Sequence, residues 1–447
     1  MSRWWNSLSP AVRRELMRPQ RGGMMARVTV AEHDPFELTL ESASFDAATW
    51  VPLPLPAATA TTDAVPRLLA WAAGEGAWFE PIEIAVAADG NRNVHARHDV
   101  AAGEPLTVVP RHLMITDDDV GRHSLVGPTS VLEGTMLSPP CAIGLWVALE
   151  QAHRESPWRA YLDALPPAFP WLAVHLPAVQ LAALIDTRAL AMIAYKAHGH
   201  RADHELISRQ HDALAALPLA EYTWGRQVSG SRCFRFQTAR GGRRALVPVA
   251  DMFDHGRADA TWAYVDGPAR FEVRAARDLG AGQEIQISYG RSGNASLVST
   301  YGFAMADNGE DEALLGVATA AGVHHLAVGS HYDRRFQLAM AIAGPDGDDL
   351  AAMARIAAAA RATIAAISKA PLAASGSPAW QASCQQVRAG EVATAAAIVE
   401  FVERVTAAGL IRSDAAWAEV IDSLDPAVTG AARMLRELAE ASRADDA

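Results

Sequence analysis

The sequence predicts an α+β fold, in which two groups of short strands are separated by a helical stretch and followed by a helical C-terminal segment. Two observations support this prediction. Apolar residues alternate in short segments within 82–110 and 247–290, among them 271–276, a pattern typical of half-buried strands. Apolar residues recur with helical spacing within 117–245 and, with few Gly or Pro breaks, within 313–447, where helices are predicted over 351–367, 391–408 and 427–441.

The first strand group follows a short helix. From Val65 an apolar face develops, and two glycines at 74 and 76 end the helix. The segment 82–86 then alternates like a strand, 89–93 is a turn cluster, and 94–97 and 106–110 continue the pattern. Residues 1–64 form an N-terminal extension and linker to which no chemistry is assigned.

The intervening stretch predicts helices over 142–153, 176–191 and 200–215. Four of its histidines, His198, His200, His204 and His211, lie close together in sequence. They mix loop and helix positions and have no carboxylate or cysteine partner at ligand spacing. Solvated helix faces explain them, so no metal site is predicted.

The second strand group, from Val247 to Phe303, contains the residues that suggest chemistry. Tyr289 leaves a strand directly into Gly290, which places the tyrosine at a strand end where its hydroxyl can face a cleft. Core packing explains the tyrosines and phenylalanines of this stretch at least as well as catalysis does, if spacing is the only guide.

Five short motifs occur here in order. They are D-M-F-D-H at 251–255, G-x-E at 282–284, I-S-Y-G at 287–290, N-x-x-L at 294–297 and Y-G-F at 301–303. This order resembles the SET-domain protein methyltransferases, of the Rubisco large-subunit lysine methyltransferase and actin-histidine methyltransferase type. The resemblance implies a SET-domain β core over 65–310 with a helical insertion over about 117–245. It also implies an all-α C-terminal domain over 311–447, similar to a substrate-docking domain.

The cofactor implied by the resemblance is S-adenosylmethionine (AdoMet). The residues that it places at the cofactor are Gly90, Asn91, Arg92, Arg232, Asp251, Met252, Phe253, Asp254, His255, Tyr289, Tyr301, Gly302 and Phe303. Two positions depart from the family pattern: Asn93 stands where the family has a second glycine, and Asp254 stands where it has asparagine. An aspartate accepts hydrogen bonds as asparagine does but cannot donate as an amide.

The resemblance implies Tyr289 as the catalytic residue. Its substrate channel would be lined by Trp224, Ser231, Arg232, Phe234, Asp251, Tyr289, Tyr301 and Phe303. An arginine at position 232 can pair with a carboxylate through two hydrogen bonds. Without the resemblance, a surface ion pair would explain Arg232 better.

Composition narrows the class of partner. A net charge of −12 argues against a nucleic-acid partner and suits a basic peptide, although solubility explains the same charge. The three cysteines are widely spaced, so we expect a reducing cytoplasm and no disulfide framework. No uninterrupted apolar run is long enough for a membrane span, and no secretory signal is expected. Nothing in the composition fixes the oligomeric state.

The function expected from the sequence is transfer of a methyl group from AdoMet to a lysine side chain of a non-histone protein. A histidine target is a close variant, because the resembled branch contains both activities. The alternative is a SET-like protein-binding module without catalysis, which the departures at Asn93 and Asp254 suggest.

Overall fold

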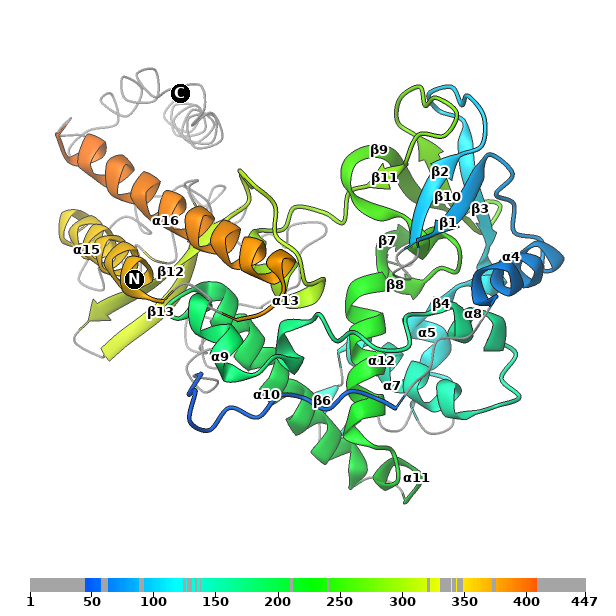
Figure 1. The fold of residues 1–447 in the computed structure, drawn as a ribbon, viewed down its shortest axis with the longest axis horizontal. Coiled ribbons are helices and arrows are strands. Elements are labelled where there is room, and N and C mark those ends of the chain that lie inside the picture. The colour runs from blue at the N-terminus through cyan, green and yellow to red at the C-terminus, as the bar shows by residue number, and fades with distance from the viewer. Residues whose placement is uncertain are drawn as a thin grey trace, which may run out of the picture. The chain divides into compact units, whose positions relative to one another are not determined.

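The computed structural model describes residues 45–57, 63–87, 92–123, 126, 131–132, 135–136, 138–209, 212–238, 241–319, 322–329, 339, 343, 349–371 and 375–407. They form two compact units (Figure 1). Unit 1 comprises Met1–Pro52, Trp171–Lys196 and Ser292–Ala447, and unit 2 comprises Leu53–Pro170 and Ala197–Arg291. Each unit is therefore built from stretches that are distant in sequence.

The strands of unit 2 form small sheets. A hairpin pairs β1 (Ile82–Val86) with β2 (Arg92–Ala96). A four-stranded sheet has the order β11-β9-β10-β3, with β3 at Pro105–Pro110, β9 at Asp254–Val265, β10 at Arg270–Ala275 and β11 at Gln286–Ile287. A three-stranded sheet has the order β4-β8-β7, with β4 at Ile115–Thr116, β7 at Phe234–Thr238 and β8 at Gly241–Leu246. The short pair β5 (Val131–Leu132) and β6 (Thr135–Met136) completes the set described.

The two strand groups seen in the sequence meet in the four-stranded sheet. Strand β10 pairs antiparallel with β3, so that Phe271 lies opposite Val109. Phe271, Val273 and Ala275 are buried on one face, as their alternation predicted. The turn before β11 contains Gly282 at a φ of 77°, a conformation that glycine adopts without steric cost. Strand β11 pairs parallel with β9, and this brings 254–260 beside 286–287.

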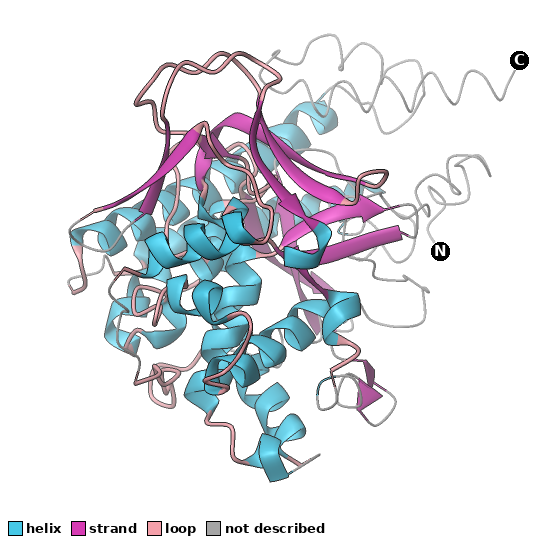
Figure 2. Ribbon diagram, turned by 90° about the vertical axis from the view of Figure 1, so that its right-hand side faces the viewer, coloured by secondary structure: helices cyan, strands magenta, loops and turns pink. Residues whose placement is uncertain are grey.

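The helices of unit 2 lie between the strand groups along the chain. They are α4 (Ala64–Gly74), η1 (Arg111–Leu113), α5 (Asp117–Val120), α7 (Pro139–Ala152), α8 (Arg159–Ala164), α11 (Asp212–Ala215), α12 (Leu219–Arg232) and η4 (Ala250–Met252). Helices α7 and α12 pack closely because glycines face each other: a Cβ at Gly225 would lie 2.1 Å from the carbonyl oxygen of Gly144. In Figure 2, helices occupy more of the described chain than strands do.

Unit 1 combines helices with one hairpin. Its elements are η2 (Ala173–His175), α9 (Ala178–Leu181), η3 (Ala182–Leu184), α13 (Asn294–Thr300), β12 (Glu312–Thr319), β13 (Gly322–Gly329), α15 (Asp349–Lys369) and α16 (Pro378–Ala407). Helix α10 (Arg188–Ser208) begins in unit 1 and ends in unit 2. The helix predicted over 176–191 is interrupted because Asp186 adopts a φ of 65° and α10 begins only afterwards.

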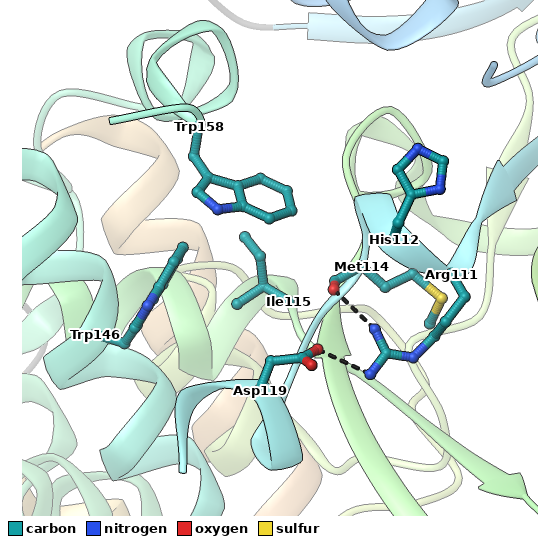
Figure 3. Close-up of a pocket in the computed structure, with 7 residues that line it drawn as sticks. All are labelled: Arg111, His112, Met114, Ile115, Asp119, Trp146 and Trp158. Atoms are coloured by element: carbon teal, nitrogen blue, oxygen red, sulfur yellow. Dashed lines mark hydrogen bonds and ion pairs between the residues drawn. The ribbon is translucent and has the colours of Figure 1, made fainter. Parts of the chain in front are cut away.

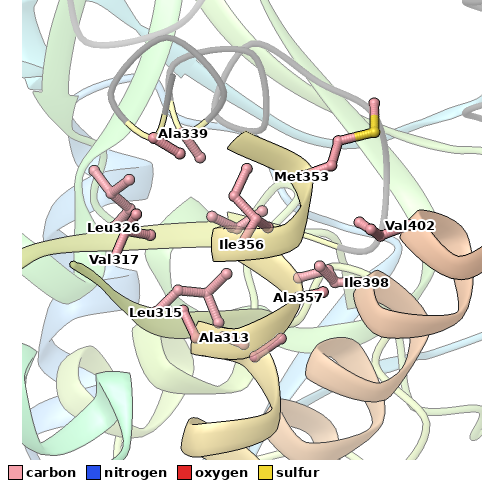
Figure 4. Close-up of a cluster of buried hydrophobic side chains, with 14 of the residues drawn as sticks. Ala313, Leu315, Val317, Leu326, Ala339, Met353, Ile356, Ala357, Ile398 and Val402 are labelled. Atoms are coloured by element: carbon pink, nitrogen blue, oxygen red, sulfur yellow. The ribbon is translucent and has the colours of Figure 1, made fainter. Parts of the chain in front are cut away.

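The expectation of an all-α C-terminal domain is corrected at β12 and β13. These strands pair antiparallel from Glu312↔Gly329 to Thr319↔Gly322. Residues Ala313, Leu315 and Val317 are buried against α15 and α16, as Figure 4 shows. Their alternation has the period of a strand, and burial of one face by the two helices stabilises it. The remaining described elements of this segment are helical, and the helix predicted over 427–441 lies outside the described residues.

One helix of the described residues is long and apolar enough by composition to cross a membrane. This stretch of α15, Ala351–Lys369, has 44% of its residues buried inside the protein. Its residues Met353, Ile356 and Ala360 belong to the core shared with the hairpin and α16. Core packing therefore accounts for the apolar face of this helix.

A buried carboxylate connects helices within unit 1. The Glu391 side chain on α16 accepts hydrogen bonds from the backbone N–H groups of Arg188 and Ala189, at 2.9 and 3.3 Å. These groups belong to the first turn of α10, where unpaired N–H groups favour an anion. Burial nevertheless raises the pKa of Glu391 to about 8. The Arg188 guanidinium pairs with Glu312 at 2.6 Å, so β12 joins the same cluster.

Candidate functional site

Tyr289 lies just beyond β11, held at both ends by the segment 253–255. Its hydroxyl donates to the backbone carbonyl of Phe253 at 2.9 Å. Its backbone N–H donates to Nδ1 of His255 at 3.0 Å, and the two rings lie 5.1 Å apart. The hydroxyl proton is therefore directed at a carbonyl, and this hydrogen bond fixes the direction of the phenol.

The hydrogen bond from the Tyr289 N–H fixes the tautomer of the His255 ring. Nδ1 accepts from the backbone N–H of Tyr289, so in the neutral ring the proton is on Nε2. Burial lowers the pKa of His255. A neutral imidazole thus fixes the path of the chain between β11 and Tyr289.

The segment before β9 is strained. Val249 adopts a φ of 70° and a ψ of −48°, which is unusual for a β-branched residue. The 3-10 turn η4 follows directly, and the backbone carbonyls of Asp251 and Phe253 accept hydrogen bonds from Arg232 and Tyr289. The Met252 and Phe253 side chains are buried, so these two residues offer a site only their backbone groups. Strain of this kind persists where the surrounding packing fixes it, and it clusters at functional sites.

Arg232 ends α12 and is held by Asp251. Its Nη1 donates to the Asp251 carbonyl at 2.8 Å and lies 3.5 Å from the Asp251 carboxylate, whose side chain is 0% exposed. Tyr161 on α8 donates to the same carboxylate at 2.8 Å. Burial raises the pKa of Asp251, although Arg232 and Tyr161 both oppose this shift. Arg232 Nε and Asp251 Oδ1 are buried and have no hydrogen-bond partner among the described residues.

The two departures from the family pattern lie together. The Asn93 amide nitrogen donates to Glu284 at 3.1 Å and lies 3.5 Å from the Asp254 carboxylate. Burial, and then repulsion from Glu284, raise the pKa of Asp254 to about 6, while Arg232 opposes the shift. The Gln286 amide also donates to Glu284, at 3.3 Å. Neutral amides thus hold two neighbouring carboxyl groups.

The remaining predicted residues of the β1–β2 hairpin are partly described. Arg92 donates to the carbonyl of Ala164, and burial lowers its pKa, with repulsion from Arg232 as the second cause. Two arginines and Asp251 therefore share one region of unit 2. Gly90 and Asn91, expected at the cofactor, lie outside the described residues.

Two predicted channel residues, Trp224 and Phe234, have buried side chains. Trp224 is 2% exposed on α12, and its indole donates to the Pro166 carbonyl at 2.8 Å. Phe234 is buried on β7 against Trp262 and Phe271, with ring centroids 5.2 and 4.8 Å away. Spacing alone could not distinguish a wall of a channel from an aromatic core. The Ser231 hydroxyl, predicted in the same channel, donates to the Gln227 carbonyl one helical turn earlier.

Tyr301, Gly302 and Phe303 belong to unit 1. Tyr301 caps α13, and its ring lies 6.0 Å from that of Phe303. Gly302 adopts a φ of 87°, and a Cβ there would lie 2.6 Å from the Trp171 ring. The turn is secured by buried Asn294, which accepts from the Met305 N–H and donates to the Met305 carbonyl.

A pocket of about 310 Å³ lies elsewhere in unit 2 (Figure 3). Trp146 and Trp158 meet edge to face on one side, with ring centroids 6.0 Å apart. On the other side Arg111 pairs with Asp119 at 2.9 Å and donates to the Met114 carbonyl at 3.3 Å. None of the predicted site residues lines this pocket, so we assign it no part in the candidate site.

Sequence reasoning missed Tyr161 and Gln286. Tyr161 is ninety positions from Asp251, and no motif marks it. Gln286 lies within the strand pattern, but its amide contact with Glu284 depends on the turn before it. Among the described residues, no group of three or more His, Cys, Asp or Glu side chains could hold a metal ion.

No family model matches the chain. An actin-histidine N-methyltransferase of Danio rerio is 27% identical over 268 residues, which cover 57% of this chain and 45% of the relative. The Homo sapiens enzyme of the same name is 27% identical over 261 residues, which cover 56% of this chain and 44% of the relative. The chain thus spans less than half the length of these curated relatives.

Solved structures give the fold. The SET domain of LSMT bound to lysine and AdoHcy has a TM-score of 0.61 at 16% identity, covering 78% of this chain and 92% of that one. Rubisco LSMT bound to AdoMet has a TM-score of 0.60 at 17% identity, and the match covers 77% of this chain and 92% of that one. The resemblance that the motifs indicated is confirmed: the chain has the fold of the SET-domain methyltransferases.

Proposed function

We propose that the chain is an AdoMet-dependent protein N-methyltransferase that modifies a lysine side chain of a non-histone protein. A histidine target is the close variant, since relatives of both kinds resemble the chain. The observation that carries the proposal is the Tyr289 hydroxyl, held at 2.9 Å from the Phe253 carbonyl at the end of β11. An oriented phenol can accept a hydrogen bond from an incoming amine and align it.

The charges of the site suit an amino-acid group. Arg232 offers a cation with an unused Nε donor, and Asp254 with Glu284 offers carboxyl groups. The methionyl part of AdoMet carries one carboxylate and one ammonium, so each charge has a partner of opposite sign on this chain. When bound, AdoMet would supply a methyl group on a sulfonium, ready for in-line displacement.

The target must be uncharged to react. A free lysine amine has a pKa of about 10.4, so it is almost fully protonated at neutral pH. Desolvation beside the ring of Tyr289 would lower that pKa, and aromatic rings also stabilise methylated ammonium products. The chain's net charge of −12 is compatible with a basic protein segment as substrate and disfavours nucleic acid. The free cysteines 141, 233 and 384 support a reducing, cytoplasmic location.

Calorimetric titration with AdoMet and with its demethylated product tests the proposal. We expect micromolar binding of both, followed by transfer of labelled methyl groups to a protein in a cell lysate. The matched control is the Tyr289→Phe variant, which should bind AdoMet but label far less protein. Absence of binding by both compounds would refute the enzyme proposal. It would favour the alternative of a protein-binding module without catalysis, which Asn93 and Asp254 suggest.

A further inference from the structure

We propose that Asn93 is a positioning residue: it holds Asp254 and Glu284 together, and the two carboxyl groups form one binding site for the primary ammonium group of the cofactor. Binding of the ammonium at this site releases a proton from the protein. This inference rests on the proposed function, because the ammonium belongs to AdoMet. It goes further by assigning a role to Asn93, which departs from the family pattern. It also makes cofactor affinity depend on pH.

The geometry of three side chains carries the inference. Asn93 on β2 reaches both carboxyl groups: its amide nitrogen lies 3.1 Å from Glu284 Oε1 and 3.5 Å from Asp254 Oδ2. The strands bring these residues together, since the neighbouring His95 bridges to Glu284 and β11 pairs with β9 at Asp254. One amide thus spans groups that are 161 and 191 positions away.

The donors around the pair are neutral. Glu284 Oε1 accepts from the amides of both Asn93 and Gln286. An amide satisfies a lone pair but does not neutralise a carboxylate, so two partly buried negative charges repel each other. A primary ammonium has three donors and a positive charge, so it would both donate hydrogen bonds to the carboxyl groups and offset their negative charge. Among the described residues no cationic side chain pairs directly with either carboxyl group, so the pair is preorganised to bind a cation.

The charged groups of the protein around Asp254 and Glu284 explain why the cation is expected to come from the ligand. The ionisable groups on the elements packed against the pair include Arg92 and His95 on β2, Arg232 on α12 and Asp251 on η4. On and near β9 and β11 they are His255, Arg257, Asp259, Tyr264 and Tyr289, of which Asp259 is paired with Arg277 at 2.6 Å. Arg232 lowers the pKa of Asp254, but it is already engaged with Asp251. The balance of burial, Glu284 and Arg232 leaves the pKa of Asp254 at about 6.

The proton balance follows. Below pH 6, Asp254 is largely a neutral acid, and its proton must pass to solvent before the carboxylate can pair with the ammonium. The ammonium keeps its own protons, and no covalent bond other than O–H changes. AdoMet affinity should therefore weaken by up to tenfold for each pH unit below about 6.

The test measures binding between pH 5 and 8 by calorimetry in buffers of different ionisation enthalpy. The probes are AdoMet and 5′-methylthioadenosine, which keeps the nucleoside but lacks the amino-acid part. We expect the full chain to release close to one proton per AdoMet at pH 5, almost none at pH 8, and none with 5′-methylthioadenosine at any pH. The Asp254→Asn variant keeps His255, so it should lose the proton release if Asp254 is the source.

A double-mutant cycle tests Asn93 itself. Asn93→Ala should weaken AdoMet binding by about tenfold, leave 5′-methylthioadenosine binding unchanged, and raise the pH midpoint because the carboxyl pair loses a shared donor. The same change in the Asp254→Asn background should have a clearly smaller effect. Additive effects, or equal proton release with both probes, would overturn the inference while AdoMet binding itself stands. Failure of every probe to bind would overturn the proposed function and the inference together.

Discussion

The hydroxyl of Tyr289 and the backbone carbonyl of Phe253 are joined by a hydrogen bond of 2.9 Å. This contact joins the second residue after β11 to the residue that precedes β9. It fixes the direction of the phenol without using its acceptor lone pairs. The chain thereby presents an oriented oxygen at the end of a strand.

Substituting Tyr289→Phe should lower kcat by about a hundredfold, because the variant lacks the oxygen that aligns the amine and misplacement of a reacting group costs about this much. AdoMet affinity should stay within about threefold, since the ring and its contact with His255 remain. Methyl-transfer kinetics and calorimetry measure the two quantities. The control is Tyr264→Phe on β9, where the packing contact with Phe236 is made by the ring. Near-normal transfer by the Tyr289 variant would remove this residue from the mechanism.

Substituting Tyr161→Phe should destabilise the protein by about 1.5–3 kcal/mol, the typical value of a hydrogen bond to a charged group. The lost donor serves the Asp251 carboxylate, which is fully buried beside Arg232. Denaturant unfolding measures the change in free energy, again with Tyr264→Phe as control. An effect no larger than that of the control would mean that Arg232 alone satisfies Asp251.

Substituting Gly225→Ala should destabilise unit 2 by about 1–3 kcal/mol through overpacking. The new methyl group would lie 2.1 Å from the Gly144 carbonyl oxygen, which is backbone and cannot rotate away. Gly230→Ala on the same helix is the matched control, because nothing lies within 4 Å of its Cβ position. That control should be neutral, or stabilising by up to about 1 kcal/mol from helix propensity. Equal melting temperatures for the two variants would contradict close packing of α7 and α12.

The stability of the protein should fall as pH rises from about 4.5 to about 8, in part because of Glu391. Burial raises its pKa to about 8 in the folded state, against 4.5 when exposed, so the folded state keeps a proton that the unfolded chain loses. One such group contributes a slope of at most about 1.4 kcal/mol per pH unit. Unfolding free energies across this range should vary less in Glu391→Gln than in the natural chain. An unchanged slope would show that other groups carry the dependence.

Local patterns in the sequence specified much of the β core. Alternation placed the strands at 82–86, 106–110 and 271–276 within a residue or two, because one buried face imposes a period of two. Helical spacing likewise placed α7, α15 and much of α16. Ala313, Leu315 and Val317 also alternate with the period of a strand. The alanine-rich helices that follow led to the prediction of an all-α segment, so the hairpin was not predicted.

The order of the short motifs along the chain was enough to predict the fold and to place Tyr289 at the end of a strand. The surroundings of individual side chains followed only from contacts between distant segments. Trp224 and Phe234 are buried, which their spacing did not predict, because the burial of a side chain depends on elements distant in sequence. The Asn93 amide nitrogen and the Asp254 carboxylate, from two separate departures along the chain, lie 3.5 Å apart because β2 bridges to Glu284 at His95 and β11, which follows Glu284, pairs with β9. Hydrogen bonds between distant strands have no sequence period, so no linear pattern could reveal them.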